Sequence, residues 1–176
     1  SEMCIRDRNT NLDLGKLPPQ ALDLEESVLG ALMLEKDALT NVIDILKPEN
    51  FYKDANKEIY QSIIDLFNDS EPIDLLTVTS QLKKNGKLEY VGGSFYVTQL
   101  TTRVNSASNI EYHARIILEQ SIKRQLIEVS GEVQKEAYED TTDVFDLLDN
   151  TEQSLFDISE SHICLLYTSP SPRDFG

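Results

Sequence analysis

Few residues in this 176-residue sequence have the types and spacing needed for metal or nucleophilic chemistry. The cysteines are Cys4 and Cys164, and the histidines are His113 and His162. Structural zinc sites and nucleophilic triads need several such residues at defined spacing. His113 has no Cys, His or carboxylate partner at metal-ligand spacing, so we interpret it as a structural or solvent-facing residue. We expect no metal site and no catalytic residue here.

Two Gly-Lys pairs, Gly15–Lys16 and Gly86–Lys87, are the candidates for a phosphate-binding loop. A P-loop needs the pattern G-x-x-x-x-G-K-[ST], because its backbone N–H groups surround phosphate and its lysine reaches the same group. The upstream glycine is replaced by Thr10 in one pair and by Gln81 in the other, and leucine follows each lysine. We therefore expect this segment to bind no cofactor.

Paired carboxylates are a third possible source of chemistry, as general acid and base. The clearest pairs are Glu25 with Glu26, and Asp143 with Asp146. Both stand where a helix is expected to begin, and acidic side chains favour helix N-termini through capping and the helix dipole. Capping and solvation explain these pairs more simply than catalysis does.

The charge balance limits the partners of this chain. It has 16 Lys and Arg against 31 Asp and Glu, a formal net charge of −15, with 40% hydrophobic and 27% charged residues. Phosphate neutralisation requires excess positive charge, so we expect no strong nucleic-acid binding. No apolar run of about 18 residues and no secretory signal is present. We expect a cytoplasmic protein with no membrane contact.

The two ends of the sequence can be encoded by one DNA element read in opposite orientations. One end reads SEMCIRDR and the other CLLYTSPSPRD, and back-translation of the second contains the first on its complementary strand. The element resembles a sequencing adapter, and coincidence is the alternative. We expect Ser1–Arg8 and Cys164–Gly176 to be adapter artefacts that flank a fragment of a longer gene.

The remaining sequence divides by composition and periodicity. We predict an adapter artefact (1–8), an extended lead-in (9–20), a helical head (21–104), a helical hairpin (105–160) and a second adapter artefact (164–176).

The head shows helical periodicity and almost no strand signals, which predicts an all-α fold. Apolar residues recur at helical spacing from Asp23 onward, and Asp74 is placed to cap a helix that ends near Gly86. The other helices are expected at about Ala38–Leu46, Asn56–Asn68 and Phe95–Thr101.

The last third predicts two long helices that form an antiparallel hairpin. The first, about Asn109–Glu139, contains no proline, and the second begins after Thr142 or Asp143. Apolar residues alternate at steps of four and three, which is typical of helices packed side by side. The first series is Ile122, Leu126, Val129 and Val133, and the second is Val144, Leu148, Thr151, Leu155 and Ile158.

The hairpin is too narrow and too charged to form a core alone. Residues 109–160 hold 13 acidic and 4 basic side chains, and a two-helix hairpin buries little surface. We infer that it packs on another copy or another protein; the alternative is that it folds back on the head. The predicted self-association seam consists of Val144, Leu148, Leu155 and Ile158.

Two further residues are candidates for partner binding. Tyr96 follows the Gly92–Gly93 turn and either presents its ring at the surface or packs in the core. Ile127 lies one step from Leu126 and either contacts a partner or belongs to the core. The basic residues Arg115, Lys123 and Arg124 are expected to form ion pairs within the helix rather than to bind phosphate.

Five segments, in order, resemble the N-terminal part of bacterial replicative DNA helicases of the DnaB type. They are PPQALDLEESVLGAL from Pro18, the pair Phe51-Tyr52, PIDLLTVT from Pro72, LEYVGGSFY from Leu88 and NIEYHARI from Asn109. Any one of these would be a weak match, but five in order at family spacing are specific. The resemblance covers about Lys16–Glu160.

The resemblance implies a helical head and hairpin that assemble into the collar of a hexameric ring. In that family the collar receives primase and takes part in helicase loading, and a separate ATPase domain uses ATP and Mg²⁺. By position, Tyr96, Ile127 and Val133 correspond to primase-contact sites. The sequence alone leaves open a free-standing helical adaptor without a motor domain, or an enzyme of unknown type.

Overall fold

The computed structural model describes residues 15–104 and 107–166, with side chains described as far as His162. All regular elements in these ranges are helical, which confirms the predicted fold class. The predicted artefact at 1–8 lies outside the described residues, and so does the one at 164–176 except for residues 164–166, which continue helix α7. Helix α7 extends to Leu166, beyond the expected end of the hairpin at 160.

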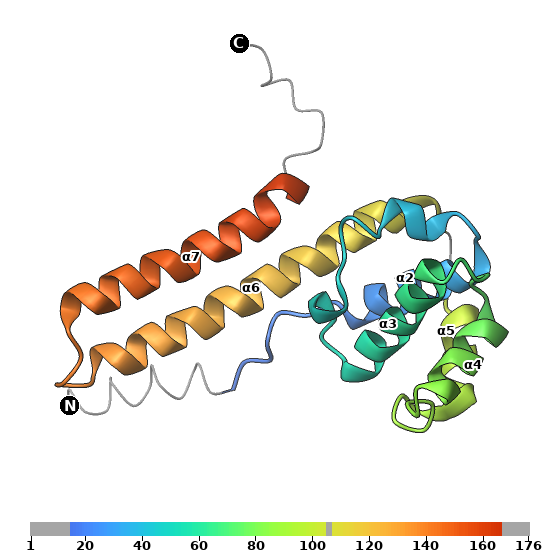
Figure 1. The fold of residues 1–176 in the computed structure, drawn as a ribbon, viewed down its shortest axis with the longest axis horizontal. Coiled ribbons are helices and arrows are strands. Elements are labelled where there is room, and N and C mark those ends of the chain that lie inside the picture. Colours follow the sequence, from blue (N-terminus) through green and yellow to red (C-terminus); the bar gives the residue numbers. More distant parts are fainter. Residues whose placement is uncertain (1–14, 105–106, 167–176) are drawn as a thin grey trace, which may run out of the picture.

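The helices fall into two groups (Figure 1). The head contains α2 (Leu22–Leu34), α3 (Asp54–Asn68), α4 (Leu75–Lys84) and α5 (Gly93–Thr102), with the short 3-10 helices η1 (Ala38–Asn41), η2 (Pro48–Asn50) and η3 (Ala107–Asn109). The hairpin contains α6 (Ile110–Ala137) and α7 (Val144–Leu166). The two long helices lie side by side and project away from the head.

Helix α2 is the centre of the head, because α3, α4, α5 and α6 all pack against it. Its buried face includes Val28, Leu29 and Leu32. The side chains of Ile59 and Leu100 complete this core from α3 and α5. Burial of such side chains is the main source of stability for a domain of this size.

Gly30 allows α2 to approach α5 closely. A Cβ atom at this position would collide with the carbonyl oxygen of Leu100 and with the side chain of Val104. Neither the α5 backbone nor the packed valine can move away freely, so only glycine fits at this crossing.

The first three turns of α6 pack in the head, and the rest of the helix extends away from it. Ile110, Ala114 and Leu118 are buried against the head core. From Ile122 onward no residue of α6 is fully buried. The head therefore anchors one end of α6, and α7 is the neighbour of the other end.

Two predicted caps are present. The Asp74 carboxylate accepts hydrogen bonds from the N–H groups of Leu76 at 2.8 Å and Thr77 at 2.9 Å. Asp143 accepts bonds from the N–H groups of Phe145 at 2.8 Å and Asp146 at 3.3 Å. These contacts explain the acidic residues at these positions as helix caps.

The short helix predicted at Ala38–Leu46 is present only over its first four residues, as a 3-10 helix. The chain forms only η1 and then a hydrogen-bonded turn, in which Leu46 N–H donates to the Val42 carbonyl at 2.9 Å. The apolar residues that suggested a helix are nevertheless buried, because the irregular turn still directs them into the core. The Leu46 carbonyl is used by the Tyr60 hydroxyl, which donates to it at 2.9 Å.

Replacing Gly30 with alanine tests the close crossing of α2 and α5. We expect Gly30→Ala to lower the free energy of unfolding by about 1–3 kcal/mol through overpacking, measured by urea denaturation. The matched control is Gly131→Ala in α6, where a Cβ would meet nothing within 4 Å. That change should be neutral or stabilise by up to about 1 kcal/mol, because alanine favours helix. Equal effects of both changes would contradict the packing argument.

Candidate docking surfaces

A buried carboxylate on α2 connects this helix to the start of α3 and the residues before it. Glu25 of α2 is 1% exposed. Its carboxylate accepts hydrogen bonds from Tyr52 N–H at 2.8 Å, Lys53 N–H at 3.4 Å and Asn56 Nδ2 at 3.0 Å. A buried charge is tolerated only when donors surround it in this way. Glu25 lies in the first turn of α2, as predicted, but the prediction that its side chain is solvated is wrong.

Tyr96 belongs to the same network. Its hydroxyl donates to Asn56 Oδ1 at 2.7 Å, and the Lys53 ammonium lies 4.0 Å from the centre of its ring. Burial, assisted by the charge of Glu26, raises the pKa of the Tyr96 phenol. Gly92, with φ of 108°, is the N-cap residue before α5 and leaves room for the Tyr96 Cβ atom. The half-buried ring thus joins α5 to α3.

Ile127 is the predicted partner residue with an accessible side chain, at 57% exposure. It lies in a groove between α6 and the segment that precedes α2. The walls of this groove include Leu17 and Pro18 on one side and Leu126 and Gly131 on the other. The groove is mainly apolar, so it can accept an apolar side chain from a partner.

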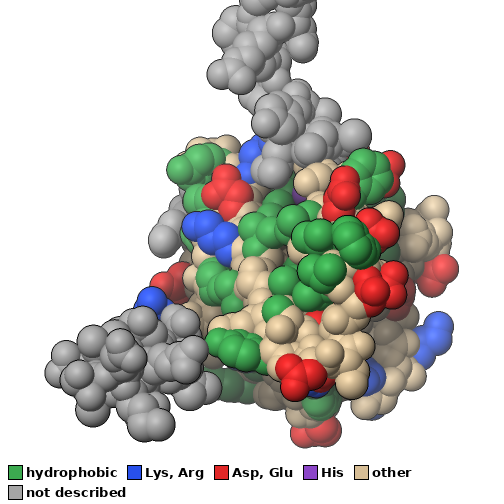
Figure 2. All heavy atoms as spheres, turned by 90° about the vertical axis from the view of Figure 1, so that its left-hand side faces the viewer, with side chains coloured by type: hydrophobic (Ala, Val, Ile, Leu, Met, Phe, Trp, Pro, Cys, Tyr) green, Lys and Arg blue, Asp and Glu red, His purple; other side chains and the backbone are tan. Residues whose placement is uncertain are grey.

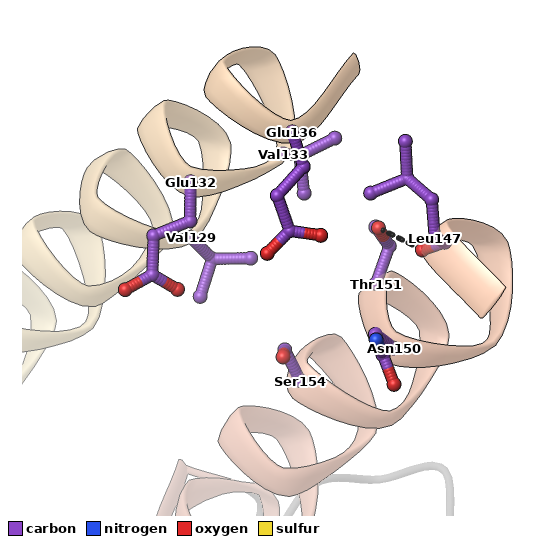
Figure 3. A pocket seen from close by; sticks show the side chains of 8 residues that line it. All are labelled: Val129, Glu132, Val133, Glu136, Leu147, Asn150, Thr151 and Ser154. Carbon is purple, nitrogen blue, oxygen red and sulfur yellow. Dashed lines mark hydrogen bonds between the residues drawn. The ribbon is translucent and has the colours of Figure 1, made fainter. Parts of the chain in front are cut away.

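Val133 faces the interior of the hairpin. Figure 3 shows the space between α6 and α7, into which side chains from both helices project. Helix α6 contributes Val129, Glu132, Val133 and Glu136, and α7 contributes Leu147, Asn150, Thr151 and Ser154. Val133 is half-buried in this space.

The three predicted partner residues therefore occupy different environments. Tyr96 belongs to a hydrogen-bond network in the head, Ile127 to a surface groove, and Val133 to the inside of the hairpin. The structure does not bring them together as one site. Ile127 is the residue that a partner could contact without displacing other side chains.

Most of the predicted self-association seam is exposed. Val144, Leu148 and Leu155 are exposed to between 44% and 60%, and Ile158 is half-buried. Figure 2 looks onto the end of the molecule where the hairpin turns and shows hydrophobic side chains gathered on this face. Carboxylates lie around them.

Two aromatic residues on α7 extend this exposed surface. Phe145 is 73% exposed and Phe156 is 56% exposed. The pattern of four- and three-residue steps did not include them, because they lie to one side of that seam. The signal available in the sequence was the apolar pair that each forms with its neighbour, Val144 and Leu155 respectively.

The basic residues of α6 have separate roles. Arg115 pairs with Glu111 one turn earlier, at 2.9 Å. Arg124 instead donates to the backbone carbonyls of Pro19 at 2.7 Å and Asn50 at 2.8 Å. The expected ion pair within the helix is thus confirmed for Arg115 and wrong for Arg124, which joins α6 to two other segments.

His162 is a buried residue whose role the sequence did not indicate. Its Nε2 atom lies 3.2 Å from Oε1 of Gln125. The C-terminal part of α7 therefore contacts the middle of α6. Burial lowers the pKa of His162, and the nearby Lys47 lowers it further. The signal that was available was its position one turn after Ile158, on the inner side of α7.

The described residues contain no group of three or more metal-ligating side chains. Among the same residues, no helix is both long enough and apolar enough to cross a membrane.

Comparison with known proteins places this arrangement in a family. The profile of the DnaB-like helicase N terminal domain matches residues 17–119. A replicative DNA helicase DnaB of Rhodothermus marinus is 44% identical over 149 residues, covering 85% of this chain and 16% of the relative. The replicative DNA helicase DnaC of Bacillus subtilis is 38% identical over 151 residues, covering 86% of this chain and 33% of the relative.

Solved structures agree with these matches. The crystal structure of the N-terminal domain of DnaB helicase from Mycobacterium tuberculosis aligns with a TM-score of 0.74 and 35% identity, covering 80% of this chain and 99% of that one. A structure of a DnaB-like replicative helicase and its interactions with primase aligns with a TM-score of 0.65 at 22% identity, covering 78% of this chain and 30% of that one. The second match shows the shared fold.

The molecule is thus an all-helical module made of a head and a projecting hairpin. It belongs to the family of DnaB-like helicase N-terminal domains. The chain spans about a sixth to a third of the length of the two curated relatives described above.

Replacing Tyr96 with phenylalanine tests its assignment to the Glu25 network. We expect Tyr96→Phe to lower the free energy of unfolding by about 0.5–1.5 kcal/mol, because Asn56 loses a buried partner. Tyr112→Phe is the control, since Tyr112 is 65% exposed on α6 and its change should stay within about 0.5 kcal/mol. If both variants unfold at the same urea concentration as the parent chain, the hydroxyl contributes nothing and the assignment fails.

Proposed function

We propose that this chain is an assembly and docking domain of a hexameric replicative DNA helicase. The observation that carries the proposal is the distribution of side chains on α7. Leu148, Leu155 and the two exposed phenylalanines face solvent, whereas Asn150, Thr151 and Ser154 face α6. Leu147 lines the same inner space, but most of the large apolar side chains of α7 are exposed, which suits this helix to pack on another molecule.

Self-association through this surface fits the charge of the molecule. Exposed apolar side chains supply the attraction, and the surrounding carboxylates oppose non-specific contacts. A symmetric dimer uses one patch twice, so a single apolar surface on α7 is sufficient to pair two copies. Paired hairpins would build the collar of the ring.

The remaining partners follow from the family. We propose that primase contacts the groove around Ile127, that a helicase loader binds the assembled collar, and that ATP and Mg²⁺ act in a separate motor domain of the whole protein. The lengths of the curated relatives support a motor domain elsewhere. The structural relative described with primase supports the first partner. Tyr96 and Val133 stay predictions as primase contacts.

The double substitution Leu148→Glu and Leu155→Glu tests self-association. The parent chain should be a dimer or larger at tens of micromolar in light scattering under reducing conditions, which exclude disulfides through Cys4 and Cys164. The variant should be monomeric, because association would bury unpaired carboxylates.

The control is Gln153→Glu, which adds a carboxylate to the polar side of α7. It should leave the measured mass unchanged, and its circular dichroism should match that of both other proteins. A parent chain that is monomeric at tens of micromolar contradicts the proposed assembly.

Assays of ATP hydrolysis and of single-stranded DNA binding are a second test of the proposal. We expect the purified chain to hydrolyse ATP no faster than buffer and to bind fluorescent single-stranded DNA weakly at physiological salt, because its formal charge is −15. Coupled-enzyme and anisotropy assays measure these quantities. Robust ATP hydrolysis that follows the protein through chromatography would overturn the assignment of this segment.

A further inference from the structure

Arg124 connects three parts of the molecule that are far apart in sequence. It lies on α6, and its Nη1 atom donates to the Pro19 carbonyl at 2.7 Å. Its Nη2 atom donates to the Asn50 carbonyl at 2.8 Å, and its guanidinium lies 5.4 Å from the centre of the Tyr52 ring. The planar guanidinium is well suited to this geometry, because it presents several donors in fixed directions and stacks on aromatic rings.

A second charge supports the guanidinium. Burial lowers the pKa of Arg124, and the carboxylate of Glu25 opposes this effect. Glu25 also accepts the Tyr52 N–H, so Tyr52 contacts both charged groups. Arginine stays protonated in such surroundings, and its hydrogen bonds to carbonyls are therefore charge-assisted.

The segment Lys16–Gln20, which we call the strap, is exposed at residues 16–18 and half-buried at Pro19 and Gln20. It lies outside any regular element, and Pro18 and Pro19 have no N–H group with which to pair. Leu17 is 78% exposed, so burial contributes little at that end. The Oε1 atom of Gln20 is buried without a hydrogen-bond partner. This costs free energy in the position that the strap occupies in the structure.

The other carbonyl that Arg124 binds is fixed independently. Asn50 Oδ1 accepts from Lys47 N–H at 2.7 Å, and Asn50 Nδ2 donates to Ser121 Oγ at 3.2 Å. Asn50 therefore keeps two bonds if Arg124 is removed. The bond to Pro19 differs, because among the described residues no other hydrogen bond joins the strap to the rest of the chain.

We propose that Arg124 is a latch that holds the strap against α6, and that the strap has a closed and an open position. In the closed position the strap forms one wall of the groove described above, opposite Leu126 and Ile127. In the open position that wall is absent and this side of α6 is uncovered. The latch thereby controls the shape of the apolar surface around Ile127 without changing the head core.

Maleimide labelling of Gln20→Cys, in a whole chain whose Cys4 and Cys164 are serine, tests the latch, because the end of the Gln20 side chain is buried in the closed position. Adding Arg124→Gln should make labelling several-fold faster, because the strap opens locally. Adding Arg124→Lys should give an intermediate rate, since an ammonium can replace one bond but not the pair.

Arg115→Gln is the matched control, because it removes a guanidinium from the same helix away from the strap. It should leave labelling at position 20 unchanged. Hydrogen exchange measured by mass spectrometry is the independent readout of the head. Peptides from α2 and α3 should keep in Arg124→Gln the protection they have in the parent chain.

Two results would overturn the proposal. One is unchanged labelling at position 20 in Arg124→Gln. The other is faster exchange throughout α2 and α3 in both Arg124 variants, which would make Arg124 part of the head's general stability rather than a separate latch.

Discussion

The buried carboxylate of Glu25 constrains the rest of the head. A desolvated charge needs donors on every side, and here the donors come from the chain that leads into α3 and from Asn56 within it. The start of α3 must therefore stay against α2. Asn56 in turn fixes Tyr96, and with it the first turns of α5. Three helices thus depend on one charge for their relative positions.

The same constraint reaches the hairpin. The Tyr52 N–H is held by Glu25, and the Tyr52 ring lies beside the guanidinium of Arg124 on α6. A polar chain of contacts therefore runs from α2 to the point where α6 leaves the head. Ile117 and Leu118 of α6 are buried in the apolar core of the head. The direction of the hairpin is set by both.

The sequence predicted those elements whose signals are local. Asp74 and Asp143 cap helices as expected, because capping involves only the next three residues. Periodicity over many residues likewise predicted α3 and α6 closely. The short segment after Ala38 shows the limit of this reasoning. Its apolar spacing predicted a helix, but an irregular turn buries the same side chains equally well.

The sites were harder to predict than the helices, because their partners are distant in sequence. Glu25 resembles any acidic residue at a helix start until Tyr52 and Asn56 are placed beside it. Arg124 resembles a surface cation until the carbonyls of Pro19 and Asn50 appear. Spacing on α7 indicated which residues share a face, but it did not show which face turns toward α6.

The projecting part of α6 has a mechanical consequence. From Ile122 to Ala137 the helix extends beyond the buried part of the head, a length of roughly 24 Å at 1.5 Å per residue. It behaves as a lever arm whose pivot lies at its contact with the head. A tilt of about 10° at that pivot moves the tip by roughly 4 Å over this length. Small adjustments near the pivot are thus amplified at the far end, where the exposed phenylalanine Phe145 lies.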